Sequence, residues 1–216
     1  FGLNNLGTVL LQSGNITAAQ DTFAQALNIS RSVRNIAGEG LSLSNLGLTA
    51  AASGNYEEAI KRYETALNLR RQSVDPQGEA NTRNNLGDAY RAVNQHRNAL
   101  VLYRSALRQA QTTSDVPNQF RALRGLVQSN SALRLYPPAF QAVRQHLALA
   151  QQQENRFEQL LSLQLAADLY RVTGDLAMAR RFYEQAIALA GALGDTQSQA
   201  ILRNDLAQVI YSLPKL

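Results

Sequence analysis

The two histidines are the residues with the most catalytic potential in this chain of 216 residues, which contains no cysteine. A metal site needs a histidine at ligand spacing from another His, Asp or Glu, and a nucleophilic hydroxyl needs a histidine beside it as general base. Neither His96 nor His146 has such a partner in the sequence, no Ser or Thr is placed for activation, and no glycine-rich phosphate loop occurs. His96 stands 40 residues after Tyr56, in a position that predicts packing. We therefore expect no enzyme activity, no metal and no cofactor.

Asparagines at regular intervals are the second group of residues with binding chemistry. Asn5, Asn45 and Asn85 are separated by 40 residues, and Asn4 and Asn84 repeat the same interval one position earlier. An amide side chain offers a donor and an acceptor, so it can pair with a peptide N–H and C=O at once. One such amide in each repeat could hold an extended peptide by its backbone. The alternative is that one asparagine position packs inside the protein or is simply solvated.

The same 40-residue period runs through most of the chain. Gly14, Gly54 and Gly174 share one position, which Asn94 and Arg134 occupy in the other two repeats. A period in this range indicates stacked supersecondary units, none of which can bury its apolar face alone. Three further positions repeat with it: Leu6-Gly7, Leu46-Gly47 and Leu86-Gly87; Ala19, Ala59, Ala99, Ala139 and Ala179; and Phe23, Tyr63, Tyr103, Val143 and Tyr183.

Each 40-residue unit is predicted to contain two amphipathic helices joined by a short turn. In the second unit, Leu43, Leu46 and Ala50 follow helical spacing, Gly54 is a helix-ending residue, and Asn55 can cap the next helix. Short connections make neighbouring helices antiparallel, and no strand-like alternation occurs. The predicted helices cover roughly residues 1–13, 16–34, 36–53, 56–73, 76–93, 96–113, 116–133, 136–153, 155–173, 175–192 and 196–213.

Composition limits the setting of the protein. The absence of cysteine fits a reducing compartment, no apolar run is long enough to span a bilayer, and no secretory signal is visible. We expect a cytoplasmic protein without membrane insertion. Because the chain starts at Phe1 inside an apparent repeat, we interpret it as a fragment, which leaves an upstream signal or anchor open.

The net charge of +5 and the pI near 9.8 raise the question of nucleic acid. The basic residues are dispersed rather than gathered into one stripe. Arginines recur near the ends of alternate predicted helices, where a cation complements the helix dipole. We prefer this interpretation, and a phosphate-binding stripe is the alternative. The residues concerned are Arg31, Arg34, Arg70, Arg71 and Arg108.

The repeat resembles the tetratricopeptide repeat, whose signature is a Leu-Gly pair in the first helix, a Gly-Asn or Gly-Asp turn, and Ala, an aromatic residue and Ala in the second. Its 40-residue length is similar to the long form found in kinesin light chains, in Leu-Gly-Asn repeat proteins and in bacterial signalling proteins. The first unit shows Leu6-Gly7, Gly14-Asn15, Ala19, Phe23 and Ala26; the second Leu46-Gly47, Gly54-Asn55, Ala59, Tyr63 and Ala66; the third Leu86-Gly87, Asn94-Gln95, Ala99, Tyr103 and Ala106; and the fifth Gly174-Asp175, Ala179, Tyr183 and Ala186.

The resemblance implies an all-α, right-handed superhelix of about five helix-turn-helix repeats. We expect a single array over residues 1–216, closed by a capping helix at 195–213. The fourth unit departs from the pattern, because Val127, Arg134 and His146 replace small or turn residues there. We expect a wider helix spacing in that unit, and compensating repacking is the alternative. The repeat boundaries are expected at about 1–35, 36–75, 76–115, 116–154 and 155–194.

In this family the first helix of each unit lines a concave groove. The resemblance thus implies a protein-interaction scaffold that binds an extended peptide or a partner helix. Acidic groups would suit the groove arginines, unless Asp88 and Asp168 neutralise Arg91 and Arg171 three residues later. The alternatives are a sensor module that gates an attached effector and a basic nucleic-acid-binding solenoid. The implied groove residues are Asn4, Asn5, Thr8, Asn45, Leu48, Asn84, Asn85, Asp88, Arg91, Arg121, Arg124, Gln128, Gln164, Asp168 and Arg171.

Overall fold

Eleven helices, arranged in consecutive packed pairs, make up the part of the chain that the computed structural model describes, residues 2–212. No strand occurs in that range, so the predicted all-α class is confirmed. Observed and predicted helix bounds differ by no more than two residues. The helices are α1 (Gly2–Gln12), α2 (Ile16–Ser32), α3 (Ile36–Ala52), α4 (Tyr56–Gln72), α5 (Pro76–Ala92), α6 (His96–Thr112), α7 (Val116–Ala132), α8 (Tyr136–Gln152), α9 (Arg156–Thr173), α10 (Leu176–Leu193) and α11 (Thr196–Ser212).

Every connection between these helices uses the same turn. One residue adopts a left-handed conformation, as at Gly14 with φ 80° and at Val74 with φ 52°. The next N–H then bonds to a carbonyl five residues back, which satisfies a free C=O at the helix end; the Asn15 N–H to Leu10 O distance is 2.9 Å. The predicted turn glycines therefore lie where expected, but the geometry persists without glycine. The non-glycine residues in this conformation are Arg34, Val74, Asn94, Ser114, Arg134 and Glu154.

The residue after the left-handed one caps the following helix. The side chain of Asn55 accepts a hydrogen bond from the Glu58 N–H at 3.2 Å, and that of Asp75 accepts one from the Gly78 N–H at 2.9 Å. Each bond satisfies one N–H that the first helical turn leaves without an intrahelical partner. The repeating pair of a left-handed residue and an Asn or Asp thus sets the ends of most helices from local sequence alone.

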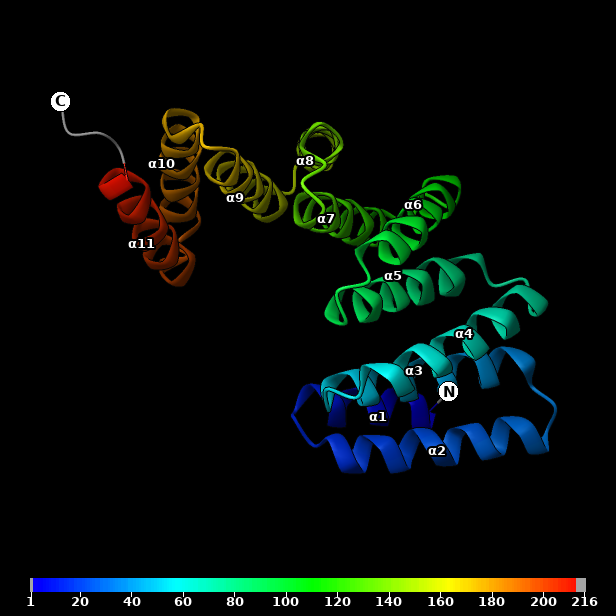
Figure 1. The fold of residues 1–216 in the computed structure, drawn as a ribbon. Coiled ribbons are helices and arrows are strands. Elements are labelled where there is room, and N and C mark those ends of the chain that lie inside the picture. The colour runs from blue at the N-terminus through cyan, green and yellow to red at the C-terminus, as the bar shows by residue number, and fades with distance from the viewer. Residues whose placement is uncertain (1, 213–216) are drawn as a thin grey trace. The chain divides into compact units, whose positions relative to one another are not determined.

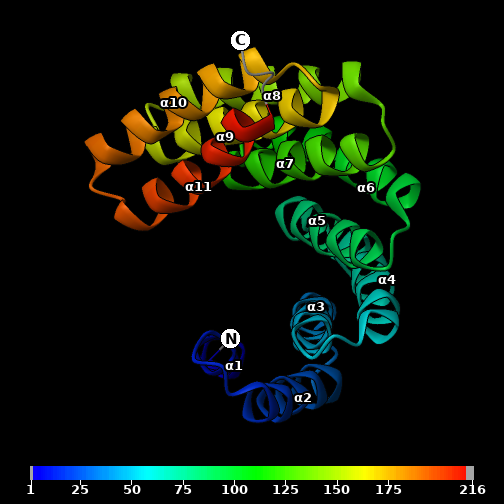
Figure 2. The same cartoon turned by 60° about the vertical axis from the view of Figure 1, so that its left-hand side comes forward.

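Residues Phe1–Gly125 and Leu126–Leu216 form two compact units, which we call unit 1 and unit 2, and the division falls inside α7. Within unit 1 each helix contacts the next, and α3 also contacts α1 and α5. Figures 1 and 2 show α1, α3 and α5 in one layer and α2, α4 and α6 in the other. In unit 2, α8, α9, α10 and α11 contact one another in sequence. The first helices of the repeats in unit 1 therefore share one layer.

Aromatic residues from the second helix of a repeat fill the interior opposite glycine. Phe23 and Tyr63 are buried, and a Cβ built on Gly7 or Gly47 would lie 2.5 Å from their rings. Such a distance is far below van der Waals contact, so only glycine lets the ring pass. This packing explains the Leu-Gly pair of the repeat. In unit 2, Tyr183 takes the aromatic position and Ala167 takes the glycine position.

The fourth repeat fills the same space with a different pair of residues. Val127 stands at the glycine position and Val143 at the aromatic position, and both are buried. A larger residue on one helix is thus matched by a smaller one on the other, as a tightly packed interior requires. This pairing supports compensating repacking. The wider helix spacing stays a prediction, since no observation tests it.

Candidate functional site

Tyr103 connects the interior of unit 1 to its polar surface. The ring passes between α5 and α7, because a Cβ on Gly87 would lie 2.7 Å from it and one on Gly125 would lie 2.4 Å from it. The Tyr103 hydroxyl then donates a 2.7 Å hydrogen bond to Asp88 Oδ1. Burial and the nearby Asp88 carboxylate raise the pKa of Tyr103. The phenol therefore stays protonated and fixes the position of the carboxylate.

Asp88 in turn anchors an arginine from the next repeat. Its Oδ2 accepts a 3.1 Å bond from Arg121 Nη2, which also donates to Asn85 Oδ1 at 2.7 Å. Asn85 donates through Nδ2 to Asn81 at 3.1 Å. The side chain of Asp88 is 45% exposed and that of Arg121 is 32% exposed, so the pair lies at the surface. Asp88 is thus paired with Arg121 across the helix joint, rather than with Arg91 on its own helix.

Cations outnumber anions on this part of the surface. The groove residues of α5 and the first part of α7 include three guanidinium groups, on Arg91, Arg121 and Arg124, and one carboxylate, on Asp88. Arg91 and Arg124 are half-buried. Arg91 lies near enough to the Tyr103 hydroxyl to oppose the rise in its pKa. These positions give the surface two more positive than negative charges.

Two of the predicted groove asparagines lie inside the protein, which corrects our expectation for them. Asn84 is 0% exposed, and its Nδ2 donates to the Asn118 carbonyl at 3.1 Å and to Asn118 Oδ1 at 3.0 Å. Asn4 is buried too, and its Nδ2 donates to Ser42 Oγ at 3.2 Å. Both residues face the first helix of the following repeat, where a small polar residue meets them. Their position in the repeat therefore joins repeats and does not face a ligand.

The other groove residues of the first two repeats lie at or near the surface. Asn5 and Thr8 are exposed, whereas Asn45 and Leu48 are half-buried. Asn45 donates through Nδ2 to Asn4 Oδ1 at 2.9 Å, so part of its amide is already used. Asn85, with 4% exposure, forms the floor beneath Arg121 rather than a contact surface. The asparagine series is thus graded from exposed Asn5 to buried Asn85.

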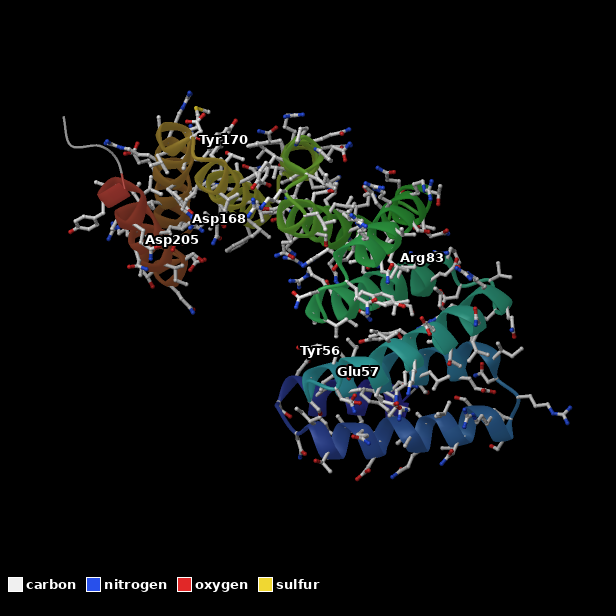
Figure 3. The ribbon with its side chains drawn as sticks, viewed as in Figure 1. Tyr56, Glu57, Arg83, Asp168, Tyr170 and Asp205 are labelled. Carbon is white, nitrogen blue, oxygen red and sulfur yellow. The ribbon has the colours of Figure 1, made fainter. Side chains whose placement is uncertain are left out.

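Unit 2 repeats the tyrosine–aspartate pair. The Tyr183 hydroxyl donates to Asp168, and Arg171 Nη2 lies 3.7 Å from Asp168 Oδ1. This ion pair matches the neutralisation that we weighed for Asp168. Burial raises the pKa of Asp168, and Asp205 of α11 contributes in the same direction. Figure 3 shows Asp168 and Asp205 near each other. Of the other groove residues, Gln164 is half-buried and Gln128 is exposed.

A buried cluster of His146, Ser162 and Glu158 is the arrangement that sequence reasoning missed. His146 Nδ1 lies 2.7 Å from Ser162 Oγ, and its Nε2 lies 3.4 Å from Glu158 Oε2. The expectation that no serine lies beside a histidine is therefore wrong. The two residues come from neighbouring helices, α8 and α9, so no local spacing reveals them.

The protons in this cluster indicate a structural role. The Ser162 hydroxyl donates to the Glu158 carbonyl oxygen at 2.7 Å, so its oxygen must accept from His146 Nδ1. A general base would instead have to take the serine proton. His146 and Ser162 are also both 0% exposed, which keeps substrate away.

Metal and membrane sites were sought in the same part of the chain. Among residues 2–212, no three His, Asp or Glu side chains are grouped so that they could hold a metal ion. None of the helices described there combines the length and apolarity that crossing a bilayer requires.

Solved structures with similar folds share little sequence with this chain. A structure from Podosopora anserina, described as kinesin light chain nearly identical TPR-like repeats, is 18% identical with a TM-score of 0.77, and the match covers 90% of this chain and 95% of that one. A Rap protein complexed with competence and sporulation factor is 15% identical with a TM-score of 0.71, covering 97% and 63%. A Pyrococcus horikoshii signal transduction ATPase with a tetratricopeptide repeat sensor is 18% identical with a TM-score of 0.80, covering 97% and 32%.

Sequence comparisons establish the family. A search of curated proteins finds no match. A family model described as tetratricopeptide repeat matches residues 2–72 and 38–112, and a second model of the same description matches residues 161–192. The first model alone spans more than half of the 216 residues. Together with the repeating glycine–aromatic packing, these matches show that the chain belongs to the tetratricopeptide repeat family.

Proposed function

We propose that this chain is a protein-interaction scaffold and that the layer formed by α3, α5 and the first part of α7 binds an extended, acidic segment of a partner protein. The observation that carries this proposal is the excess of cations on the surface around Asp88, where only one carboxylate accompanies three guanidinium groups. Because guanidinium groups form paired hydrogen bonds with carboxylates, such a surface favours Glu or Asp side chains.

The arrangement divides the arginines by task. Arg121 is held by Asp88 and Asn85, so it is a fixed part of the surface. Arg124 forms no ion pair with any described residue and keeps its donors for a ligand. Arg91 borders the Tyr103 hydroxyl and can turn its remaining donors outward. We assign Arg91 and Arg124 the direct contacts with acidic side chains.

Amide groups on the same layer can hold the backbone of the segment. Asn45 uses Nδ2 on Asn4, which leaves its Oδ1 to accept from a peptide N–H. Asn5 is exposed on α1 and offers both donor and acceptor. The structure of the Rap protein with competence and sporulation factor supports the idea that an array of this kind can hold a separate factor.

Peptides of opposite charge test the proposal. Fluorescein-labelled, end-blocked (Glu-Ser)5 and (Lys-Ser)5 are titrated with the protein, and binding is followed by fluorescence anisotropy. We expect the glutamate peptide to bind and the lysine peptide to bind at least tenfold more weakly. The double variant Arg91→Gln, Arg124→Gln should reduce affinity about 30-fold at low salt, for a loss of about 1 kcal/mol at each site. Added salt should narrow that difference.

The matched control is the double variant Arg97→Gln, Arg104→Gln, which removes two exposed arginines of α6. It changes the net charge equally but leaves the groove layer intact, so affinity should stay within twofold. Equal losses in both double variants would reduce the effect to net charge and reject the proposed surface. A single-stranded oligonucleotide that binds more tightly than the glutamate peptide, with steep salt dependence, would favour nucleic acid instead.

A sensor role is the second candidate. It is favoured by one observation, the likeness to the Pyrococcus horikoshii protein whose repeats are described as a sensor. The same peptide-binding surface would serve this role, with the bound segment acting as signal.

A further inference from the structure

Tyrosines fill a notch at the joint between repeats, and unit 2 shows this packing most clearly. Tyr170, near the end of α9, has its ring centroid 4.7 Å from that of Phe140 in the preceding helix and 5.4 Å from that of Phe182 in the following helix. Figure 3 shows that Tyr170 lies on the other side of α9 from Asp168. The site is therefore a slot whose two walls come from consecutive second helices.

Unit 1 fills the equivalent slot of the third repeat in the same way. Tyr90 stands 80 residues before Tyr170 and packs in one cluster with Ile60 and Leu102, which occupy the positions of Phe140 and Phe182. The Tyr90 hydroxyl donates to Glu64 at 3.0 Å. An aromatic ring is thus the natural occupant of this slot in two repeats.

The second repeat carries Ala50 at this position, and a cavity of about 110 Å³ lies beside it. Its walls include Gln20 and Arg62, which stand at the positions of the two flanking aromatic residues of unit 2. Leu46 and Thr49 belong to the same lining. Replacing tyrosine by alanine therefore leaves an opening of defined shape, which we call the Ala50 notch.

Arg62 gives the notch a preference for aromatic rings. Its Nε lies 2.7 Å from Glu58 Oε1, so the guanidinium group is held in place, and its side chain is 29% exposed. A guanidinium group held against a flat slot attracts the face of an aromatic ring. Glu58 also lines the cavity and can accept a phenol proton, as Glu64 does from Tyr90.

We propose that the Ala50 notch binds one aromatic side chain, tyrosine or phenylalanine, of a partner protein. The equivalent slots in this chain are filled by protein side chains of that kind, which is why the occupant is a side chain and not a free metabolite. Ala50 lies two residues after Leu48, about 200° further around α3, so the notch faces away from the groove layer. The inference therefore stands without the acidic-peptide proposal.

The test uses p-cresol, which has the shape of the tyrosine side chain. It is titrated into the isotope-labelled 216-residue chain while amide signals are followed by NMR. We expect saturable shifts at Thr49, Ala50 and Ser53, with a Kd on the order of 1–10 mM for so small a ligand. End-blocked Gly-Tyr-Gly should shift the same signals, and end-blocked Gly-Leu-Gly should bind at least threefold more weakly.

Four variants sharpen the result. Ala50→Tyr fills the notch from within and should weaken p-cresol binding at least tenfold, whereas Ala37→Tyr, at an exposed position on the same helix, should leave it unchanged. Arg62→Gln should weaken binding two- to fivefold. Tyr90→Ala should open a second notch, so that two sites are occupied and p-cresol raises the melting temperature of this variant.

Several outcomes would overturn the proposal. One is the absence of shifts near Ala50 in the natural chain, even if p-cresol stabilises Tyr90→Ala. A second is unchanged affinity in Ala50→Tyr. Binding of p-cresol without Gly-Tyr-Gly would reject a protein side chain as the occupant. Should Ala50→Tyr fail to fold, Tyr90→Ala decides, because failure to gain a second site would contradict the equivalence of the slots.

Discussion

The hydroxyl group of Tyr103 on α6 donates a 2.7 Å hydrogen bond to the carboxylate of Asp88 on α5. The residue that fills the interior of the repeat therefore also positions an acid on the surface of the opposite layer. Tyr183 and Asp168 repeat this relationship in unit 2. In the first repeat, Phe23 takes the aromatic position and has no hydroxyl to donate. Core and surface are thus coupled in some repeats and independent in others.

Stability should fall at alkaline pH because of the buried tyrosines. Burial raises the pKa of Tyr63, Tyr103 and Tyr183 above the ordinary value of 10.0. In the unfolded chain these phenols lose protons from about pH 10, while the folded chain keeps them. The stabilisation is therefore fully present below pH 10 and is lost as pH rises above it. Urea unfolding at pH 10 and pH 11 should show a decrease of about 1 kcal/mol for each tyrosine. Tyr103→Phe should remove one third of this pH dependence, and an unchanged slope would contradict the assignment.

The glycine–aromatic pair should respond as a unit. Gly47→Val places atoms where the Tyr63 ring lies and should cost about 3 kcal/mol of unfolding free energy. Adding Tyr63→Val recreates the valine pair of the fourth repeat, Val127 and Val143. The double variant should be at least about 1 kcal/mol more stable than the sum of the single effects predicts. Chemical denaturation of all three variants checks this, and strict additivity would show that the two positions do not share space.

His146 should be a stabilising residue although the equivalent position is Ala26 or Ala66 elsewhere. His146→Ala opens a cavity and leaves Ser162 without its donor, so we expect a loss of about 2–4 kcal/mol. Ser162→Ala in addition should cost less than it does alone, with a coupling of about 1 kcal/mol. Circular dichroism melts at several urea concentrations measure these terms. No coupling would mean that the 2.7 Å contact contributes nothing.

The turn after α4 should be improvable by glycine. Val74 holds a left-handed conformation, with φ 52°, although it is β-branched and 83% exposed. Such a conformation costs a branched residue roughly 1–2 kcal/mol, and glycine adopts it freely at some cost in unfolded-state entropy. Val74→Gly should therefore raise the free energy of unfolding by about 1 kcal/mol, measured by urea denaturation. Gly54→Val, the reverse change in the preceding turn, should lower it by at least as much.

The asparagines should separate into structural and surface residues. Asn84→Ala removes the donor to Asn118 from a buried site and should cost about 1–3 kcal/mol. Asn5 is exposed, so Asn5→Ala should change stability by less than about 0.5 kcal/mol. Equal effects in thermal melts would contradict the burial difference. Replacing Asn45 and Asn85 together should now lower stability as well, because Asn4 and Arg121 each lose a partner.

Local signals in the sequence were sufficient for the helices, the turns and the family. A helix end depends on residues within one turn of it, such as the pair Gly54-Asn55, so its signal is contiguous in the chain. The 40-residue spacing of Gly47 and Tyr63 with their equivalents likewise identified the packing pair, since helices joined by a four-residue register shift must meet in every repeat. Asp88, Arg91 and Arg124 were also placed on the surface from spacing alone.

What the sequence by itself determined is therefore the repeating unit, and what only the tertiary structure decided is the use of each polar side chain between units. Asn84 and Asn85 are adjacent and chemically identical, yet one bonds to Asn118 and the other to Arg121. His146 finds Ser162 on another helix, and Ala50 leaves a notch because of what surrounds it. The physical reason is that burial and hydrogen bonding depend on residues from the next repeat, whose closeness is fixed only when the helices pack.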